Sequence, residues 1–167
     1  MPNTVWKEFS KNQLTHSGAH YLMALQEVLE EQGYARLIDV ANKLNISKGS
    51  LSTSLKPLIR KELITEDSHK HLGLSPKGEM FAKHIQNNHK IVFGFLHNTL
   101  KIDKKDADID ACKIEHLLSW KSAGAIEALS KVLEENPKLH KELLQKISEA
   151  GPCPSLAAHK VGKVKKD

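Results

Sequence analysis

The residues best suited to chemistry in this chain lie in the segment Cys112-Lys113-Ile114-Glu115-His116. The segment carries a thiol, a carboxylate and an imidazole at positions i, i+3 and i+4. On a helix these positions share one face, so the three groups can converge on one point. Sulfur, oxygen and nitrogen donors together suit a late first-row divalent ion such as Fe²⁺, Co²⁺ or Zn²⁺. A buried thiol beside a solvated charged pair is the ordinary alternative, and the triplet alone leaves it open.

The length and composition of the chain narrow the classes of protein to consider. Its 167 residues are enough for one domain or two small ones. It contains no apolar run of about 18 residues and no basic leader before an apolar segment, so we expect a cytoplasmic protein without a membrane span. The two cysteines, Cys112 and Cys153, make no disulfide framework, and we expect free thiols that are available to a metal.

Charge is distributed unevenly along the chain, which has a formal net charge of +5. Residues 34–90 carry ten Lys/Arg against five Asp/Glu, whereas residues 91–135 carry six against eight. A basic segment followed by an acidic one is typical of a duplex-binding module joined to a metal-binding or dimerisation module. An ordinary solvated surface would also give this pattern, so charge alone does not decide between them.

The elements that must position these groups begin with a predicted helix-turn-helix. An apolar stripe predicts a first helix, which Thr15 or Ser17 can cap and Gly33 can end in a left-handed conformation. A short apolar helix follows at residues 37–44, and after a tight turn Ser47 caps a third helix. Helix, tight turn and helix in this order is the helix-turn-helix pattern.

A wing and a long helix are predicted next. Residues 63–66 and 71–74 read as two short strands around a polar loop. Ser75 and Pro76 then suit the cap and first position of a helix that runs to about residue 100. The third helix and this hairpin together predict a winged helix-turn-helix.

The remainder of the chain reads as helical. After an acidic break at 103–110, we expect helices at 109–133 and 137–150, with the Cys112 triplet near the start of the first. The apolar residues of this region can form either a dimer face or an intramolecular core; they are Ile114, Leu117, Leu118, Ile126, Leu129 and Val132. The predicted fold is mainly α, with an N-terminal winged helix-turn-helix domain followed by an all-helical metal-binding and dimerisation domain.

The start of the third helix carries small and basic residues that suit contact with DNA. Short hydroxyl side chains allow close approach to base edges and phosphates, and lysines neutralise phosphate charge. The alternative to a DNA-binding role is that any one of these residues is only part of an exposed polar helix end. The candidate DNA-binding residues are Ser47, Lys48, Gly49, Ser50, Thr53 and Lys56.

Several segments together carry a resemblance to a known family. They are Leu14-Thr15-His16-Ser17, Tyr21-Leu22, Gly33-Tyr34-Ala35-Arg36 and Cys112-Lys113-Ile114-Glu115-His116-Leu117-Leu118-Ser119-Trp120. In this order around a winged helix-turn-helix, they resemble the diphtheria toxin repressor family of metal-dependent transcriptional regulators. The resemblance implies the short type, without the additional C-terminal barrel. We therefore expect an arm at 1–13, a DNA-binding domain at 14–78, a metal-binding and dimerisation domain at 79–154, and a basic tail at 155–167.

The resemblance also implies a set of metal ligands. Cys112, Glu115 and His116 match the ligands on the family's dimer-domain helix, and His89 matches a histidine on the connecting helix. His20 stands where the family usually has Met or Asp. Met23 and Phe93 stand where members have further carboxylates, which favours one principal metal per subunit. Because this ligand set contains a thiol and imidazoles, the preferred ion is Fe²⁺, and Mn²⁺, Co²⁺ and Zn²⁺ are the alternatives.

These expectations lead to one preferred function and leave two alternative functions open. The implied function is a metal-dependent regulator, a repressor of metal-uptake genes, in which the metal promotes binding of a homodimer to palindromic operator DNA. The nearer rival is a winged-helix regulator that senses redox state or another ligand through Cys112. The other is a small metalloenzyme with Glu115 as general base. We expect no enzyme, because the sequence has no HExxH pattern, phosphate-binding Gly-rich loop or Ser/His/Asp set.

Overall fold

The computed structural model describes residues 14–151. The arm at 1–13, the tail at 155–167 and Cys153 lie outside these described residues. The elements follow in the order α2 (His16–Gln32), α3 (Leu37–Lys43), α4 (Lys48–Arg60), β1 (Ile64–Glu66), β2 (Leu72–Leu74), α5 (Pro76–Gly94), η1 (Phe95–Thr99), α6 (Lys104–Ile114), α7 (Trp120–Glu135) and α8 (Pro137–Ala150).

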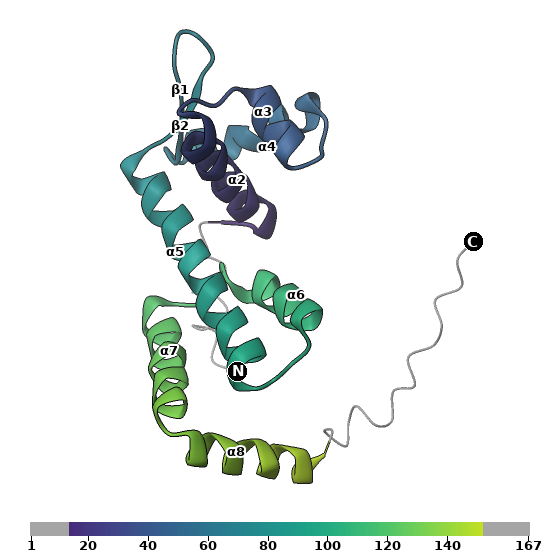
Figure 1. Ribbon diagram of the computed structural model, residues 1–167. Coiled ribbons are helices and arrows are strands. Elements are labelled where there is room, and N and C mark those ends of the chain that lie inside the picture. The colour runs from purple at the N-terminus through teal and green to yellow at the C-terminus, as the bar shows by residue number, and fades with distance from the viewer. Residues whose placement is uncertain (1–13, 152–167) are drawn as a thin grey trace, which may run out of the picture.

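The first part of the chain forms the predicted winged helix-turn-helix (Figure 1). The predicted caps are present: the side chains of Thr15, Ser47 and Ser75 each accept a hydrogen bond from a backbone N–H in the first turn of α2, α4 and α5. Gly33 ends α2 at φ 77°, in the left-handed region. The strands β1 and β2 pair in antiparallel fashion, with Thr65 opposite Gly73, and form the wing.

One hydrophobic core holds this domain together and includes the start of α5. Its largest fully buried side chains come from α2, α4, the residue before β1, and α5; they include Leu22, Leu25, Leu51, Leu55, Leu63 and Ile85. At Gly78 the α5 backbone passes so close to Leu63 that an added Cβ would collide with the Leu63 carbonyl. The start of α5 is therefore fixed against the winged domain.

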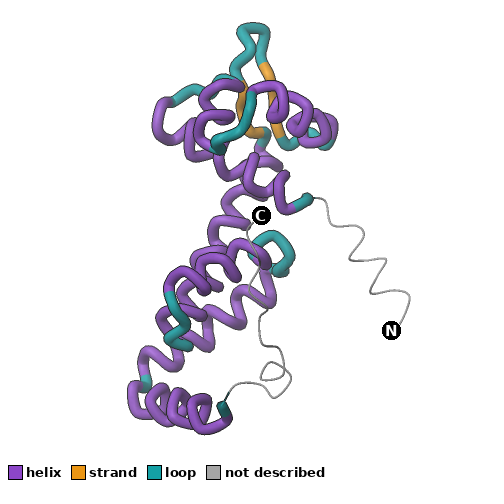
Figure 2. The backbone as a smooth tube through the Cα atoms, turned by 90° about the vertical axis from the view of Figure 1, so that its right-hand side faces the viewer, coloured by secondary structure: helices purple, strands orange, loops and turns teal. Residues whose placement is uncertain are grey.

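From there α5 runs to the other end of the molecule. Figure 2 shows the hairpin at one end, helices at the other, and a long helix joining them. Both α6 and α7 pack against α5, as α2 does on the winged side. The helix ends in η1, a π-helical turn. Among residues 14–151, no helix combines the length and apolar character needed to cross a membrane.

Two predictions about the C-terminal region are wrong. The acidic break at 103–110 is mostly helix, because the Asp103 side chain accepts a hydrogen bond from the Lys105 N–H and caps α6. Carboxylates favour the N-terminus of a helix, where they meet unpaired N–H groups. The single helix expected at 109–133 is divided, since α6 ends at Ile114 and Ser119 caps a new helix, α7. The prediction for 137–150 is confirmed by α8.

Candidate metal centre

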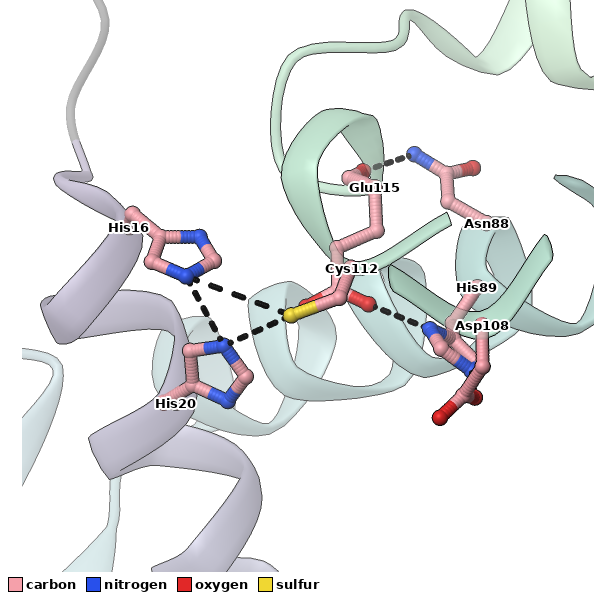
Figure 3. A network of polar contacts seen from close by, with 7 residues as sticks. All are labelled: His16, His20, Asn88, His89, Asp108, Cys112 and Glu115. Carbon is pink, nitrogen blue, oxygen red and sulfur yellow. Dashed lines mark hydrogen bonds and ion pairs between the residues drawn. The ribbon is translucent and has the colours of Figure 1, made fainter. Parts of the chain in front are cut away.

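The thiol of Cys112 meets two imidazoles of α2. Its Sγ lies 3.2 Å from Nε2 of His20 and 3.9 Å from Nε2 of His16. The two imidazole Nε2 atoms lie 3.2 Å apart. Figure 3 shows the thiol pointing from α6 toward both rings. One turn of α2 separates the two histidines, so they share a face of that helix.

Glu115 forms the centre of a second group of side chains. Its Oε2 lies 2.7 Å from Nδ1 of His89 on α5, and Nε2 of the same ring lies 3.2 Å from Oδ1 of Asp108 on α6 (Figure 3). The Glu115 side chain is only 1% exposed. One imidazole therefore joins a buried carboxylate to one on the surface.

Both groups of side chains line one cavity of about 480 Å³. His20 and Cys112 of the first group and His89, Asp108 and Glu115 of the second border it. Met23 also borders it. The cavity brings four of the five predicted metal residues to one place.

The fifth predicted residue, His116, follows α6 and does not border this cavity. Its ring instead lies beside His16, with centroids 5.2 Å apart. The triplet therefore lies differently from the prediction: Cys112 is near the end of α6 and not its start, Glu115 is the C-cap, and His116 lies in the following turn.

Two buried polar atoms at this centre have no hydrogen-bond partner among the described residues. They are Oε1 of Glu115 and Nδ1 of His116. A buried polar atom without a partner costs roughly 1–3 kcal/mol, so such atoms commonly mark a place where an ion or water belongs. A carboxylate oxygen and imidazole nitrogens close to a thiol are the donors that a late first-row divalent ion uses. The residues present fit such an ion.

Burial and neighbouring charges set the protonation of these donors. Burial lowers the pKa of both His20 and His116, and the nearby His16 lowers each further. Burial raises the pKa of the Cys112 thiol, as do Glu115 and Asp108. Burial likewise raises the pKa of Glu115, while the hydrogen bond with His89 opposes the change. The imidazoles of His20 and His116 therefore keep a free lone pair at neutral pH, and the thiol would lose its proton on binding a metal.

The turn after α6 is held by residues of α5 that the sequence analysis missed. Nδ2 of the buried Asn88 donates to the carbonyl oxygens of Glu115 and Leu118, at 2.7 and 3.1 Å. Nε2 of His84 lies 3.2 Å from the same Leu118 oxygen, and its ring stacks on Trp120. These contacts fix the backbone that carries Glu115 and His116.

His16 and Asp108 were also missed. His16 could have been found from its i, i+4 spacing to His20, which is the spacing of two ligands on one helical face. Asp108 gave no such signal, because its place beside His89 depends on how α6 packs against α5.

The candidate DNA-binding residues lie at the N-cap and in the first three turns of α4. All six are exposed. Ser47 accepts a hydrogen bond from the Ser50 N–H, and the Thr53 hydroxyl donates to the Gly49 carbonyl. Beside them lies a cavity of about 400 Å³, whose lining from α3, α4 and the wing is largely apolar and includes Glu66 and three basic residues, Arg36, Lys48 and Lys70. This face can approach a polyanion.

Comparison with known proteins places these features in context. Residues 75–144 match the family described as iron dependent repressor, metal binding and dimerisation domain. The HTH-type transcriptional regulator MntR of Lysinibacillus sphaericus is 30% identical over 129 residues, which cover 77% of this chain and 92% of that protein. The protein of the same name from Bacillus subtilis is 30% identical over 137 residues, covering 81% and 96%. These relatives are named as transcriptional regulators, not as enzymes.

A solved structure shares the fold. The manganese regulator SloR has a TM-score of 0.59 and 22% identity, covering 66% of this chain and 52% of SloR. This chain therefore spans about half the length of SloR.

Proposed function

The chain belongs to the diphtheria toxin repressor family of metal-dependent transcriptional regulators, and on that premise we propose that it is an Fe²⁺-responsive repressor of metal-uptake genes. We propose that it acts in the cytoplasm, where a homodimer of the chain binds palindromic operator DNA. The domains are proposed at 14–78 and 79–154. The observation that carries the proposal is the contact between Cys112 of α6 and His20 of α2, because it joins the DNA-binding domain to the metal-binding and dimerisation domain.

The proposed ligands are His20, His89, Cys112, Glu115 and His116. Two observations support this set. Four of the residues, all except His116, border one cavity, and Glu115 and His116 each have a buried polar atom without a hydrogen-bond partner among the described residues. When bound, a divalent cation would supply the positive charge and the bonds that join donors from α2, α5 and the end of α6. The Cys112–His20 contact and the His89–Glu115 pair already bring these donors close to one another.

The proposed mechanism follows from the position of α2. This helix packs against α4, whose exposed first turn carries Lys48 and Ser50. Fixing α2 relative to α6 therefore fixes the recognition helix relative to the dimerisation domain. In a two-fold dimer this sets the distance between two recognition helices, which must match half-sites about one helical turn apart or a multiple of it.

Exposed apolar side chains support a dimer surface in the second domain. On α7 and α8, five large apolar residues are 46 to 60% exposed: Trp120, Leu129, Val132, Leu139 and Ile147. Exposed apolar surface of this kind suits a protein–protein contact. A second copy of the chain is the proposed partner, in agreement with the description of the matched family domain.

The choice of Fe²⁺ rests on donor chemistry. SloR is described as a manganese regulator, and Mn²⁺ prefers carboxylate, carbonyl and water oxygen ligands. Here a thiol stands at position 112 and an imidazole at position 20, and such donors favour Fe²⁺, Co²⁺ or Zn²⁺. Met23 and Phe93 in place of carboxylates support one principal ion per subunit.

The test is binding of the full chain to a duplex from the region upstream of its own gene, measured anaerobically by fluorescence anisotropy with Fe²⁺, Mn²⁺ or chelator. We expect tight binding with Fe²⁺, weaker binding with Mn²⁺ at equal concentration, and the weakest in chelator. Equal binding in all three would overturn metal dependence, and tighter binding with Mn²⁺ would overturn the choice of Fe²⁺.

A further inference from the structure

We propose that His16 is an additional metal ligand of this centre, and that with His20 and Cys112 it selects ions that favour nitrogen and sulfur, such as Fe²⁺, Co²⁺ and Zn²⁺, over Mn²⁺. The inference rests on the proposed metal-dependent function. It adds a ligand that neither the family resemblance nor the sequence analysis assigned. It also gives a physical basis for metal choice in this chain.

The distances among the three donor atoms fit a shared ion. They are 3.2 Å between the two Nε2 atoms, and 3.2 and 3.9 Å from these to Sγ. A tetrahedral ion with bonds of about 2.0–2.1 Å to nitrogen and about 2.3 Å to sulfur separates its donors by roughly 3.3–3.7 Å. The observed separations bracket this range, so the three atoms could bind one ion after small side-chain rotations.

The placement of His16 favours a ligand over a packing role. The residue is exposed in the first turn of α2, where a side chain of almost any kind is tolerated. Its ring nonetheless faces three side chains of the centre: His20 at a centroid distance of 4.5 Å, His116 at 5.2 Å, and the Cys112 thiol.

His116 is a further imidazole close to the three donors His16, His20 and Cys112. It stands beside His16, and its Nδ1 is buried without a hydrogen-bond partner among the described residues. Imidazoles and a thiolate on this side of the cavity are donors that suit Zn²⁺, Co²⁺ or Fe²⁺. A hard ion such as Mn²⁺ gains little from such donors, and it would favour the Glu115 and Asp108 carboxylates on the other side of the cavity.

The test is an anaerobic Co²⁺ titration of the full chain, read by visible absorption, because the d–d bands report the ligand number and the charge-transfer band reports the thiolate. The variants are His16→Ala and, as a matched control, His69→Ala, which removes an exposed histidine of the wing. We expect His16→Ala to weaken Co²⁺ binding about tenfold or more and to change the d–d bands, while the thiolate band remains. The control should match the wild type.

A parallel Mn²⁺ titration tests selectivity. We expect His16→Ala to leave Mn²⁺ affinity nearly unchanged, so that the ratio of Co²⁺ to Mn²⁺ affinity falls about tenfold. An unchanged Co²⁺ spectrum and affinity in His16→Ala would overturn the ligand role, and equal losses for both ions would overturn the selectivity. Both readouts are independent of DNA. A His16-dependent Co²⁺ site in a chain that binds DNA equally well without metal would support this inference and overturn the proposed function.

Discussion

Nδ1 of His89 lies 2.7 Å from Oε2 of Glu115, so a helix that begins in the DNA-binding domain holds the buried carboxylate at the end of α6. The Glu115 side chain is 1% exposed, and its other oxygen has no partner among the described residues. A buried carboxylate is costly unless it is paired or binds a cation. This pair therefore serves as a structural contact without metal and offers oxygen and nitrogen donors for one.

The first prediction concerns this pair in the absence of metal. We expect His89→Ala to lower the free energy of unfolding by about 1–3 kcal/mol, because the buried Glu115 loses its partner. Adding Glu115→Gln to His89→Ala should recover part of that loss, since a neutral amide is less costly to bury. Urea unfolding in chelator measures both. Additive losses in the double variant would show that the two residues do not interact.

The second prediction concerns Asn88. We expect Asn88→Ala to lower the free energy of unfolding by about 1–3 kcal/mol, because two carbonyl oxygens of the 115–118 turn lose a donor. Because this turn carries two proposed ligands, metal affinity should also fall by about 10–100-fold. Calorimetric metal titration checks this. Asn87→Ala, at the exposed neighbouring position on α5, is the control and should change neither quantity.

The third prediction concerns the dependence of stability on pH. Burial lowers the pKa of His84 below its ordinary value of 6.5. Below that value the unfolded chain binds the proton more readily than the folded chain, so stability is complete above about pH 6.5 and decreases as the pH falls. We expect His84→Gln to make this decrease shallower in metal-free protein. The slope is reduced and not abolished, because the pKa values of His20 and His116 are lowered too. An unchanged slope would show that His84 does not contribute.

The fourth prediction concerns the DNA face. Lys48 and Lys56 are both exposed on α4. If each neutralises one phosphate, either Lys→Ala substitution should weaken binding and reduce the slope of log affinity against log salt by about 0.9. Lys138→Ala, on the exposed part of α8, is the matched control and should leave the slope unchanged. Anisotropy titrations at several salt concentrations measure this slope for each variant. An unchanged slope in both Lys48→Ala and Lys56→Ala would show that neither lysine neutralises a phosphate.

The fifth prediction concerns the redox alternative. Burial and nearby carboxylates raise the pKa of Cys112, and a thiol with a raised pKa has little of the reactive thiolate at neutral pH. We expect mild peroxide, in chelator, to leave operator affinity unchanged. A large, thiol-reversible change that is absent in Cys112→Ser would favour a redox sensor instead.

Local signals in the sequence predicted the winged domain well. The caps at Ser47 and Ser75 and the stop at Gly33 depend on residues a few positions apart, and the structure confirms all three. The division between α6 and α7 was not predicted, because Asp103 and Ser119 are equally common in loops. Their capping role depends on the neighbouring apolar residues packing against α5.

The candidate site was predicted in part for the same reason. Residues a few positions apart in the sequence, such as Cys112 and His116, could be grouped from spacing alone. The juxtaposition of Cys112 with His20 across two helices could be inferred only through the family resemblance, and the structure brings the two together. Asn88 and Asp108 were out of reach, since their partners are distant in sequence and neither position follows a recognisable spacing.

The coupling of the metal centre to DNA binding is tested most directly by comparing wild type with the double variant Cys112→Ala/His116→Ala in anaerobic anisotropy titrations, with and without Fe²⁺. Asp110→Asn, an exposed position on α6, serves as the control. We predict that Fe²⁺ tightens operator binding by about 5–150-fold in wild type and control. The double variant should bind equally with and without the ion. Full Fe²⁺ activation of the double variant, or wild-type binding that is equally tight in chelator, would contradict the coupling.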